Sequence, residues 1–403
     1  MADQPEPISV PAHVPANRVI DWDYWNPPGI AEEGDIYGAL KRLHLLPDIL
    51  WTPRNGGHWI VTRSDDVRWV RDEAEIFSHE EFILPPGSMN TLMPPSNVDP
   101  PYHARFRAVL NPVFAPGRVR SLTEATRTLT ASLIDAIVPN GQCEFQRDFA
   151  RVMPVHVFLR MLNLPTDRSS EFVGWATSYV HATEQDEREW ATAKVMGFLR
   201  DVLEDRASNP NDDMFSRIVA YRNNPRFQRE EEIMGMAMNS FIGGLDTVTN
   251  ILTFTAWHLA SHPEARRRLI AEPKIVRRAA EEYLRRFGLA VTSRVIKSDV
   301  SRKGIEMRAG DYLLVVDPLA AVDDRVWDNP MEIDFDRDVR DHDTFGNGVH
   351  RCVGEHLARM ELIVFLEEWL KRIPDFELDP EVPPVTRGGV VIGMPQLGLK
   401  WST

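Results

Sequence analysis

The chain has 403 residues, of which 43% are hydrophobic and 26% charged, and its formal net charge is −14. An acidic balance disfavours nucleic acid as a general partner, because nucleic-acid binding depends on basic surfaces. Two cysteines cannot build a disulfide framework, and no stretch approaches the roughly 20 apolar residues of a membrane-spanning helix. These features predict a cytoplasmic protein with a large hydrophobic core.

The N-terminus is polar and rich in proline over residues 1–17, and it lacks the basic start and apolar run of a signal peptide. We expect residues 1–20 to form a flexible arm and residues 21–403 to form a single domain. A β-hairpin is expected over 49–62, because two apolar runs, 49–52 and 59–62, flank a glycine-rich turn.

His103 and Arg107 lie four positions apart, just after Pro100 and Pro101. Because prolines suit the start of a helix, both side chains should lie on one helix face. Taken alone, the pair indicates no more than an ordinary solvated face.

Helical patterns dominate the rest of the chain, with good examples at 119–137, 187–205, 230–260 and 274–287. Short strands are expected near 294–296, 312–316 and 390–392, and an irregular, ordered loop is expected over 320–344. The pattern predicts a mainly α protein with a small β-rich corner and no internal domain boundary.

The helix expected over 230–260 contains an unusual centre. Gly243 and Gly244 are adjacent, and each costs roughly 0.5–1 kcal/mol in a helix relative to alanine. Asp246 and Thr247 then place polar groups in an apolar stretch, where burial is costly without hydrogen bonds. Close helix packing with a back-bonded threonine explains this centre as well as a functional role does.

Glu282 and Arg285 put opposite charges three residues apart, on one helix face. Most such pairs are solvated and contribute little. The apolar neighbours Ala279, Ala280 and Tyr283 indicate that part of this helix is buried.

Cys352 is the most informative residue, since it sits in the run Phe-Gly-Asn-Gly-Val-His-Arg-Cys-Val-Gly at 345–354, directly before an amphipathic stretch. Glycines permit tight turns and close approach of a flat ligand. A cysteine entering a helix N-terminus is favoured as thiolate, and a shielded thiolate suits a haem iron. For Cys143 we expect an ordinary buried thiol.

This run resembles the haem-binding loop of the cytochrome P-450 superfamily, the haem-thiolate monooxygenases. The resemblance implies that haem b lies between the long distal helix and the helix after the cysteine loop, with Cys352 as axial iron ligand. It also implies that Phe345 and Gly346 contact the haem.

By the same resemblance, Gly243 and Gly244 make room for dioxygen, while Asp246 and Thr247 deliver protons and form the catalytic pair. The Glu282–Arg285 pair would brace the cysteine loop together with a second arginine, for which Arg325 is the best match. The residues that would contact the haem propionates are His103, Arg107, Arg294 and His350.

Within the superfamily, the stretches 242–248 and 369–376 are similar to the soluble bacterial camphor-hydroxylase family. Camphor hydroxylases hold the substrate ketone with a tyrosine, and Thr91 stands at that position, which makes camphor a poor candidate. The expected pocket residues are Phe82, Thr91, Asn239, Ile242, Ala290 and Val390. Hydroxylation or epoxidation of monoterpenoids or norisoprenoid ketones is the leading expectation.

The family resemblance implies electrons from NADH, delivered by a flavin reductase and a 2Fe–2S ferredoxin that docks near Arg107 and Arg351. Two alternatives remain open, a peroxide-driven peroxygenase and a haem-based ligand sensor without turnover. The acid–threonine pair argues against both, because neither needs a proton-delivery pair.

Overall fold

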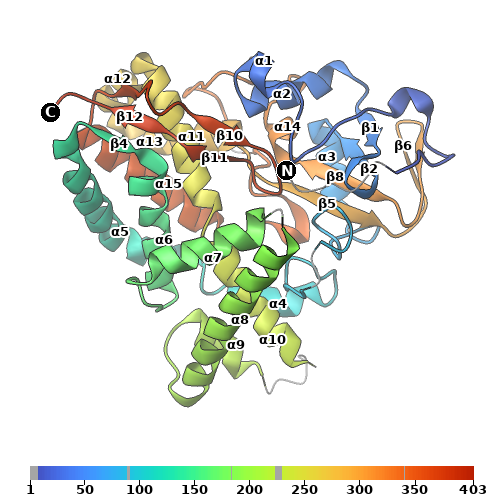
Figure 1. Ribbon diagram of the computed structural model, residues 1–403, viewed down its shortest axis with the longest axis horizontal. Coiled ribbons are helices and arrows are strands. Elements are labelled where there is room, and N and C mark those ends of the chain that lie inside the picture. Colours follow the sequence, from blue (N-terminus) through green and yellow to red (C-terminus); the bar gives the residue numbers. More distant parts are fainter. Residues whose placement is uncertain (1–7, 89–90, 183, 223–228, 340) are drawn as a thin grey trace.

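Helices fill most of the molecule, and the main sheet lies at one corner. The computed structural model describes residues 8–88, 91–182, 184–222, 229–339 and 341–403. In Figure 1 the helices occupy the left and lower parts of the view, and the main sheet lies on the right. This is the mainly α architecture with a small β-rich corner that the sequence predicted.

The main sheet has the strand order β1-β2-β8-β5-β3. Its strands are β1 (Ile49–Thr52), β2 (His58–Val61), β8 (Tyr312–Val316), β5 (Val291–Ile296) and β3 (Phe77–Ser78). β1 pairs antiparallel with β2, which confirms the predicted hairpin. The turn places Asn55, Gly56 and Gly57 at φ values of 51°, 85° and 77°, a region that glycine and asparagine tolerate.

Smaller sheets complete the β structure. They join β4 (Gln142–Glu144), β12 (Gly398–Lys400) and β9 (Glu377–Leu378), then β10 (Val385–Arg387) and β11 (Gly393–Gln396), then β6 (Val300–Arg302) and β7 (Ile305–Met307). The strand expected at 390–392 is only an isolated bridge between Val391 and Ala290, and β11 begins just after it.

Three predicted helices are confirmed with small shifts at their ends, as α5 (Pro116–Ile137), α8 (Gln185–Ser208) and α13 (Val276–Arg286). The other α-helices away from the centre are α1 (Ile30–Glu33), α2 (Ile36–Lys41), α3 (Ser64–Asp72), α4 (His103–Leu110), α6 (Val152–Met161), α7 (Ser169–His181), α9 (Met214–Ala220), α12 (Pro263–Ala271), α14 (Asp317–Ala321) and α15 (Glu355–Arg372). As expected, the described residues between α14 and Gly348 form turns and loops.

The helix expected over 230–260 is interrupted and forms α10 (Glu230–Gly243) and α11 (Thr247–Ser261). Asn250 stabilises the interruption, because its Nδ2 donates to the carbonyl of Asp246 at 3.0 Å and its Oδ1 accepts from the amide of Met394 at 3.1 Å. The expectation of one continuous helix was therefore wrong. The apolar pattern continues through the break, so this pattern alone does not indicate that the helix is interrupted.

Residues 8–20 pack along the sheet, so the expectation of a flexible arm was wrong for this part. Val14 is buried, His13 Nε2 lies 2.8 Å from Asp311 Oδ2, and the amide of Ile20 donates to the carbonyl of Trp51. A few apolar and polar contacts thus fix a segment whose composition is mostly polar. The remaining part of the expected arm, 1–7, lies outside the described residues.

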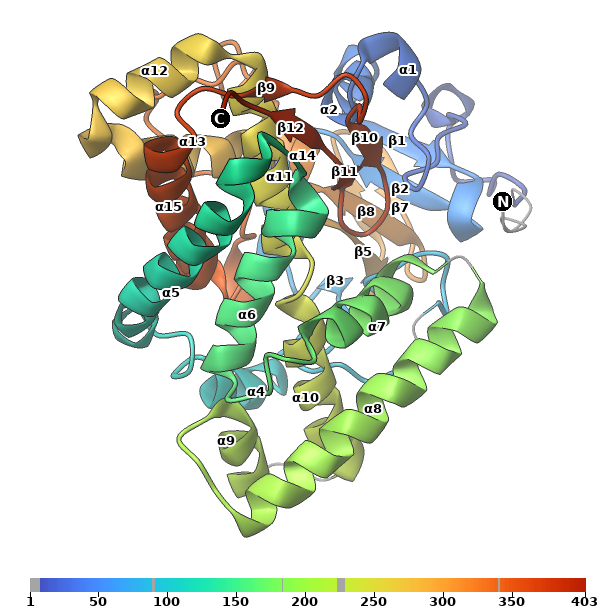
Figure 2. The same cartoon turned by 60° about the vertical axis from the view of Figure 1, so that its left-hand side comes forward.

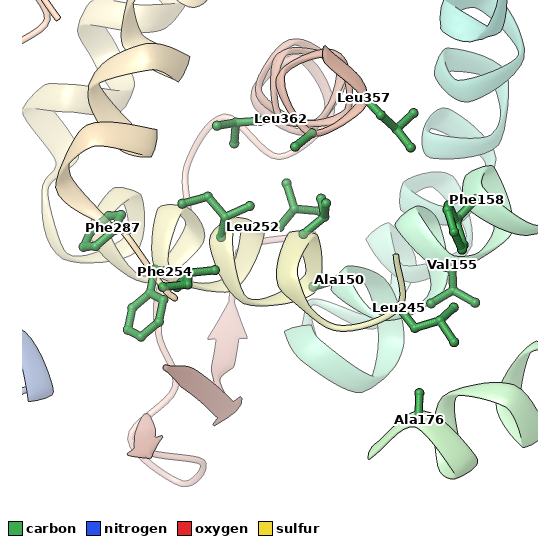
Figure 3. Packing of buried hydrophobic residues seen from close by; sticks show 14 of the residues in the cluster. Ala150, Val155, Phe158, Ala176, Leu245, Leu252, Phe254, Phe287, Leu357 and Leu362 are labelled. Carbon is green, nitrogen blue, oxygen red and sulfur yellow. The ribbon is translucent and has the colours of Figure 1, made fainter. Parts of the chain in front are cut away.

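The hydrophobic core surrounds α11. The largest buried apolar cluster includes residues from Trp22 to Leu399. In Figure 3, Leu252 of α11 faces α15, which carries Leu357 and Leu362, and Phe254 lies beside Phe287. Across the described residues, no helix is both long and apolar enough to cross a membrane.

Candidate active site

Cys352 lies where the glycine-containing loop meets α15, whose N-cap is Gly354. A β-carbon on Gly348 would lie 2.8 Å from the carbonyl oxygen of Arg71, and its φ is 66°, so only glycine fits this turn. The Cys352 side chain is accessible, whereas Cys143 is buried as expected. Burial by the surrounding protein raises the pKa of the Cys352 thiol, and a hydrogen bond from the Gly354 backbone opposes this effect. A cysteine that is accessible at the start of a helix suits binding of a metal ion.

The start of the same loop is held to its end. The amide of Cys352 donates to the carbonyl of Phe345 at 2.8 Å, and Gly346 has a φ of 70°. The guanidinium of Arg359 lies 4.6 Å from the centre of the Phe345 ring. These contacts make the loop a closed unit with a fixed cysteine.

Beside this loop, three histidines and Arg294 form what we call the imidazole cluster. His350 stacks on His79 with ring centroids 3.5 Å apart, and His103 meets His350 edge-on at 4.3 Å. Burial lowers the pKa of His103 to about 4 and that of His350 to about 2, so both rings are neutral at pH 7. The pKa of His79 is also well below its ordinary value, mainly through burial.

The imidazole cluster contains nitrogen atoms that lack a partner. Among the described residues, none accepts from Nε2 of His103, Nε2 of His350 or Nε of Arg294, although these atoms are buried. Each such group costs about 1–3 kcal/mol when unsatisfied. Burial lowers the pKa of Arg294 only to about 9, so this residue stays charged at pH 7. The cluster therefore fits a ligand with anionic oxygens, as the carboxylates of haem would be.

The structure brings His103, Arg294 and His350 together as the resemblance implied. Arg107 also points toward the loop, because its Nη1 donates to the carbonyl of Arg351 at 2.8 Å. His79 was missed, since a single histidine directly after β3 carries no sequence signal. Its role is visible only through the stack with His350.

On the opposite element, Gly243 and Gly244 have different surroundings. A β-carbon on Gly244 would lie 2.4 Å from Cζ of Phe158, whereas one on Gly243 would meet no atom within 4 Å. Phe158 belongs to α6, which faces the segment with Leu245 in Figure 3. Gly244 is thus required by packing, and Gly243 alone leaves open space.

Gly243, Asp246 and Thr247 line one large cavity at the helix interruption. The carboxylate of Asp246 lies 4.0 Å from Nη2 of Arg387, which is the last residue of β10. Burial lowers the pKa of Arg387, and the charge of Asp246 opposes this shift. Sequence reasoning missed Arg387, because 141 positions separate it from Asp246.

The cavity has a volume of about 1430 Å³. Of the expected pocket residues, Phe82, Thr91, Asn239, Ile242 and Val390 line it. Ala290 is not among its described lining residues, which corrects that prediction. The Ala290 backbone pairs with Val391 and accepts from the amide of Asp317, so the residue lies behind the cavity wall.

Glu282 and Arg285 form a fully buried ion pair with contacts of 2.7 and 2.8 Å. The prediction that Arg325 joins this ion pair was wrong. Its guanidinium binds Asp48 at 2.7 Å and is half exposed, because the chain turns away from α13 after α14. Arg337 takes this position instead, with Nε 3.2 Å from Glu282 Oε1.

Arg351 pairs with Glu355 at 2.7 Å, and Arg359 bridges Glu355 and Glu281. These cations lower the pKa of Glu355 to about 2 despite the opposing effect of its burial. A groove of about 800 Å³ beside them is lined by six arginines and four carboxylates, namely Arg120, Arg127, Arg277, Arg278, Arg337, Arg359, Glu281, Asp336, Asp338 and Glu367. The arginines outnumber the carboxylates, so this groove of the acidic protein has a net positive charge, and we call it the basic groove.

Known proteins are similar to this chain in sequence and in fold. The family model "Cytochrome P450" matches residues 176–402. The chain is 34% identical to the "Probable cytochrome P450 127A1" of Sinorhizobium fredii, over 98% of this chain and 97% of that protein. The crystal structures of CYP101C1 and CYP101J2 superpose with a TM-score of 0.89 at 35% and 33% identity, covering 98% of this chain and 100% of each of theirs. The chain therefore belongs to the cytochrome P450 family, and it is a haem-dependent monooxygenase.

Proposed function

We propose that the enzyme hydroxylates or epoxidises a compact, weakly polar substrate, such as a monoterpenoid or a norisoprenoid ketone. The observation that carries the proposal is the cavity, which the apolar residues Phe82, Ile242 and Val390 line together with Asp246 and Thr247. Charged side chains of other segments, including Asp21, Arg54 and Glu189, line the same cavity. The similarity to CYP101C1 and CYP101J2 supports the same class, as does the resemblance to camphor hydroxylases.

In this proposal Cys352 would bind the iron of haem b, which would supply the activation of dioxygen when it is bound. The imidazole cluster and Arg107 would hold the haem carboxylates, because buried nitrogen atoms of His103, Arg294 and His350 lack partners among the described residues. Phe345 and Gly346 would lie against the haem from the loop. Gly243 would leave the space above it, since a side chain there would project into the cavity.

Asp246 and Thr247 are the proposed proton-delivery pair. Oxygen insertion consumes two protons, and both residues line the cavity where these protons are needed. Arg387 lies close enough to hold the Asp246 carboxylate in place until a proton is passed. Thr247 would hold a proton at its hydroxyl where the substrate binds, since it lines the same cavity.

The variant Thr247→Ala tests this function. We expect substrate binding to persist, while most NADH is diverted into hydrogen peroxide because the hydroxyl is missing. Thr247→Ser keeps the hydroxyl and serves as the matched control. If product formed per NADH stayed at the wild-type value in Thr247→Ala, the role of Thr247 would be wrong.

We further propose that NADH, a flavin reductase and an acidic 2Fe–2S ferredoxin reduce the enzyme in the cytoplasm. The basic groove and Arg351 support this partner, because opposite charges steer association. Consumption of NADH that depends on both ferredoxin and substrate separates this function from a sensor. Turnover with peroxide alone would favour the peroxygenase. Camphor itself is a weak candidate, because Thr91 cannot place a phenol hydroxyl on its ketone.

A further inference from the structure

Tyr179 is a buried tyrosine of the cavity wall whose hydroxyl has only a weak partner. It lies on α7, which packs against α8 (Figure 2). Its side chain lines the cavity and is only 8% exposed. The hydroxyl donates to Sδ of Met93 at 3.0 Å. Because a thioether sulfur is a weak acceptor, this buried donor is poorly satisfied.

Three other polar side chains of the cavity lining have oxygen partners. Ser96 Oγ donates to Asn239 Oδ1 at 3.0 Å, and Asn239 Nδ2 donates to the carbonyl of Pro94 at 3.3 Å. The hydroxyl of Thr192 donates to the carbonyl of Arg188 at 2.8 Å. A ligand would have to break one of these bonds to use their donors, whereas Tyr179 would give up only its contact with sulfur.

The Tyr179 hydroxyl is also fixed in its donor form. Burial raises the pKa of Tyr179 to about 12, so the proton stays on the oxygen at any physiological pH. Met93 is unbranched and adaptable, so its thioether can move aside when a better acceptor arrives. The site therefore offers a neutral hydroxyl donor to a ligand carbonyl, besides the other hydroxyls and the guanidinium groups that line the cavity.

We propose that Tyr179 orients the substrate by donating a hydrogen bond to its carbonyl oxygen. The inference rests on the proposed function and names the polar group that this function requires. The tyrosine that is missing at Thr91 would thus be replaced by one from a different element. Tyr179 and Thr247 line the same cavity, so a carbonyl held by Tyr179 would decide which carbon of a compact substrate lies near Thr247.

The test compares ketones with hydrocarbons of the same shape. Camphor and bornane form one pair, an ionone and its deoxygenated analogue a second, and a steroid ketone with its parent hydrocarbon a third. Affinity is measured from the low-spin to high-spin shift of the Soret band. We expect Tyr179→Phe to weaken ketone binding by about 3- to 10-fold, the usual worth of one hydrogen bond, and to leave hydrocarbon binding within twofold.

A second variant, Met93→Leu, keeps the shape of the wall and removes the competing sulfur. Ketone affinity in this variant should equal or exceed that of the wild type. Equal losses for ketone and hydrocarbon in Tyr179→Phe would overturn the inference, since they would indicate packing alone. The inference would also be overturned if none of the ketones bound to the enzyme.

The same data separate the two proposals. If only the steroid ketone binds and its affinity depends on Tyr179, the proposed compact substrate is wrong and the role of Tyr179 stands. If the compact ketones bind but without dependence on Tyr179, the substrate class stands and the role of Tyr179 is wrong. The reduced carbon monoxide spectrum of each variant checks that its haem site is intact.

Discussion

Replacing Glu282 by alanine should leave a protein that fails to hold haem. Glu282 and Arg285 are both fully buried, and Glu282 also accepts from the amide of Asp334 at 2.9 Å and from Arg337 at 3.2 Å. Removing one partner of a buried ion pair costs about 3–5 kcal/mol, because the other charge stays buried without compensation. This is a large part of the 5–15 kcal/mol by which proteins are typically stable.

The expected loss of stability lies near the lower end of the range of about 3–5 kcal/mol. Arg285 also donates to the carbonyls of Ala321, Pro330 and Glu332, and these bonds would remain in the variant. The loop that contains Asp334 and Arg337 would, however, lose the Glu282 carboxylate that accepts its hydrogen bonds. Because this loop continues into the cysteine loop, haem retention should fall together with stability.

The assay is haem content per protein from absorbance, together with urea unfolding. The matched control is Arg325→Ala, since Arg325 forms a half-exposed pair with Asp48 that should contribute about 0–1 kcal/mol. Asp48 also keeps Lys303 as a partner in that variant. Arg337→Ala should fall between the two. Normal haem content in Glu282→Ala, or equal damage in Arg325→Ala, would refute the reasoning.

Three further predictions concern other parts of the molecule. Gly244→Ala should destabilise the protein by about 1–3 kcal/mol because it collides with Phe158, whereas Gly243→Ala should change urea unfolding little; equal effects would contradict this difference. Glu361 is buried without a partner among the described residues, and burial raises its pKa well above the ordinary value. Below about pH 4 the carboxyl is protonated in both states, so Glu361→Gln and the wild type should melt alike; at higher pH ionisation favours only the unfolded state, so the variant should melt higher at pH 8. Reduction by the ferredoxin should slow steeply with salt, and Arg351→Glu should weaken that dependence; a rate independent of salt would exclude docking at this surface.

Several features could be predicted from the sequence because each depends on residues close together in the chain. The hairpin follows from two apolar runs and a glycine-rich turn, and it is observed with Thr52 opposite His58. The spacing of His103 and Arg107 placed both on one face of α4, and both contact the cysteine loop. The cysteine run itself indicated a fixed thiol at a helix N-terminus.

Other features could not be predicted because the competing alternatives look alike in the sequence. The apolar pattern continues from α10 into α11, so the adjacent glycines and the Asp246–Thr247 pair were compatible with one continuous helix as well as with the interruption that Asn250 and Met394 stabilise. Arg325 and Arg337 both lie in an irregular loop, and only the path of that loop decides which one reaches Glu282. The sequence does not distinguish two adjacent glycines, and only the contact with Phe158 shows that Gly244 has less space than Gly243.

The sequence by itself determined the family of this protein and its haem-dependent chemistry, because the cysteine run is a short contiguous motif whose residue types favour binding of a haem iron. Only the tertiary structure decided which distant side chains complete the site. His79 reaches His350, Arg387 reaches Asp246, and Tyr179 reaches Met93. Each of these contacts joins segments that meet only after the core has packed, and periodicity and spacing carry no information about such meetings.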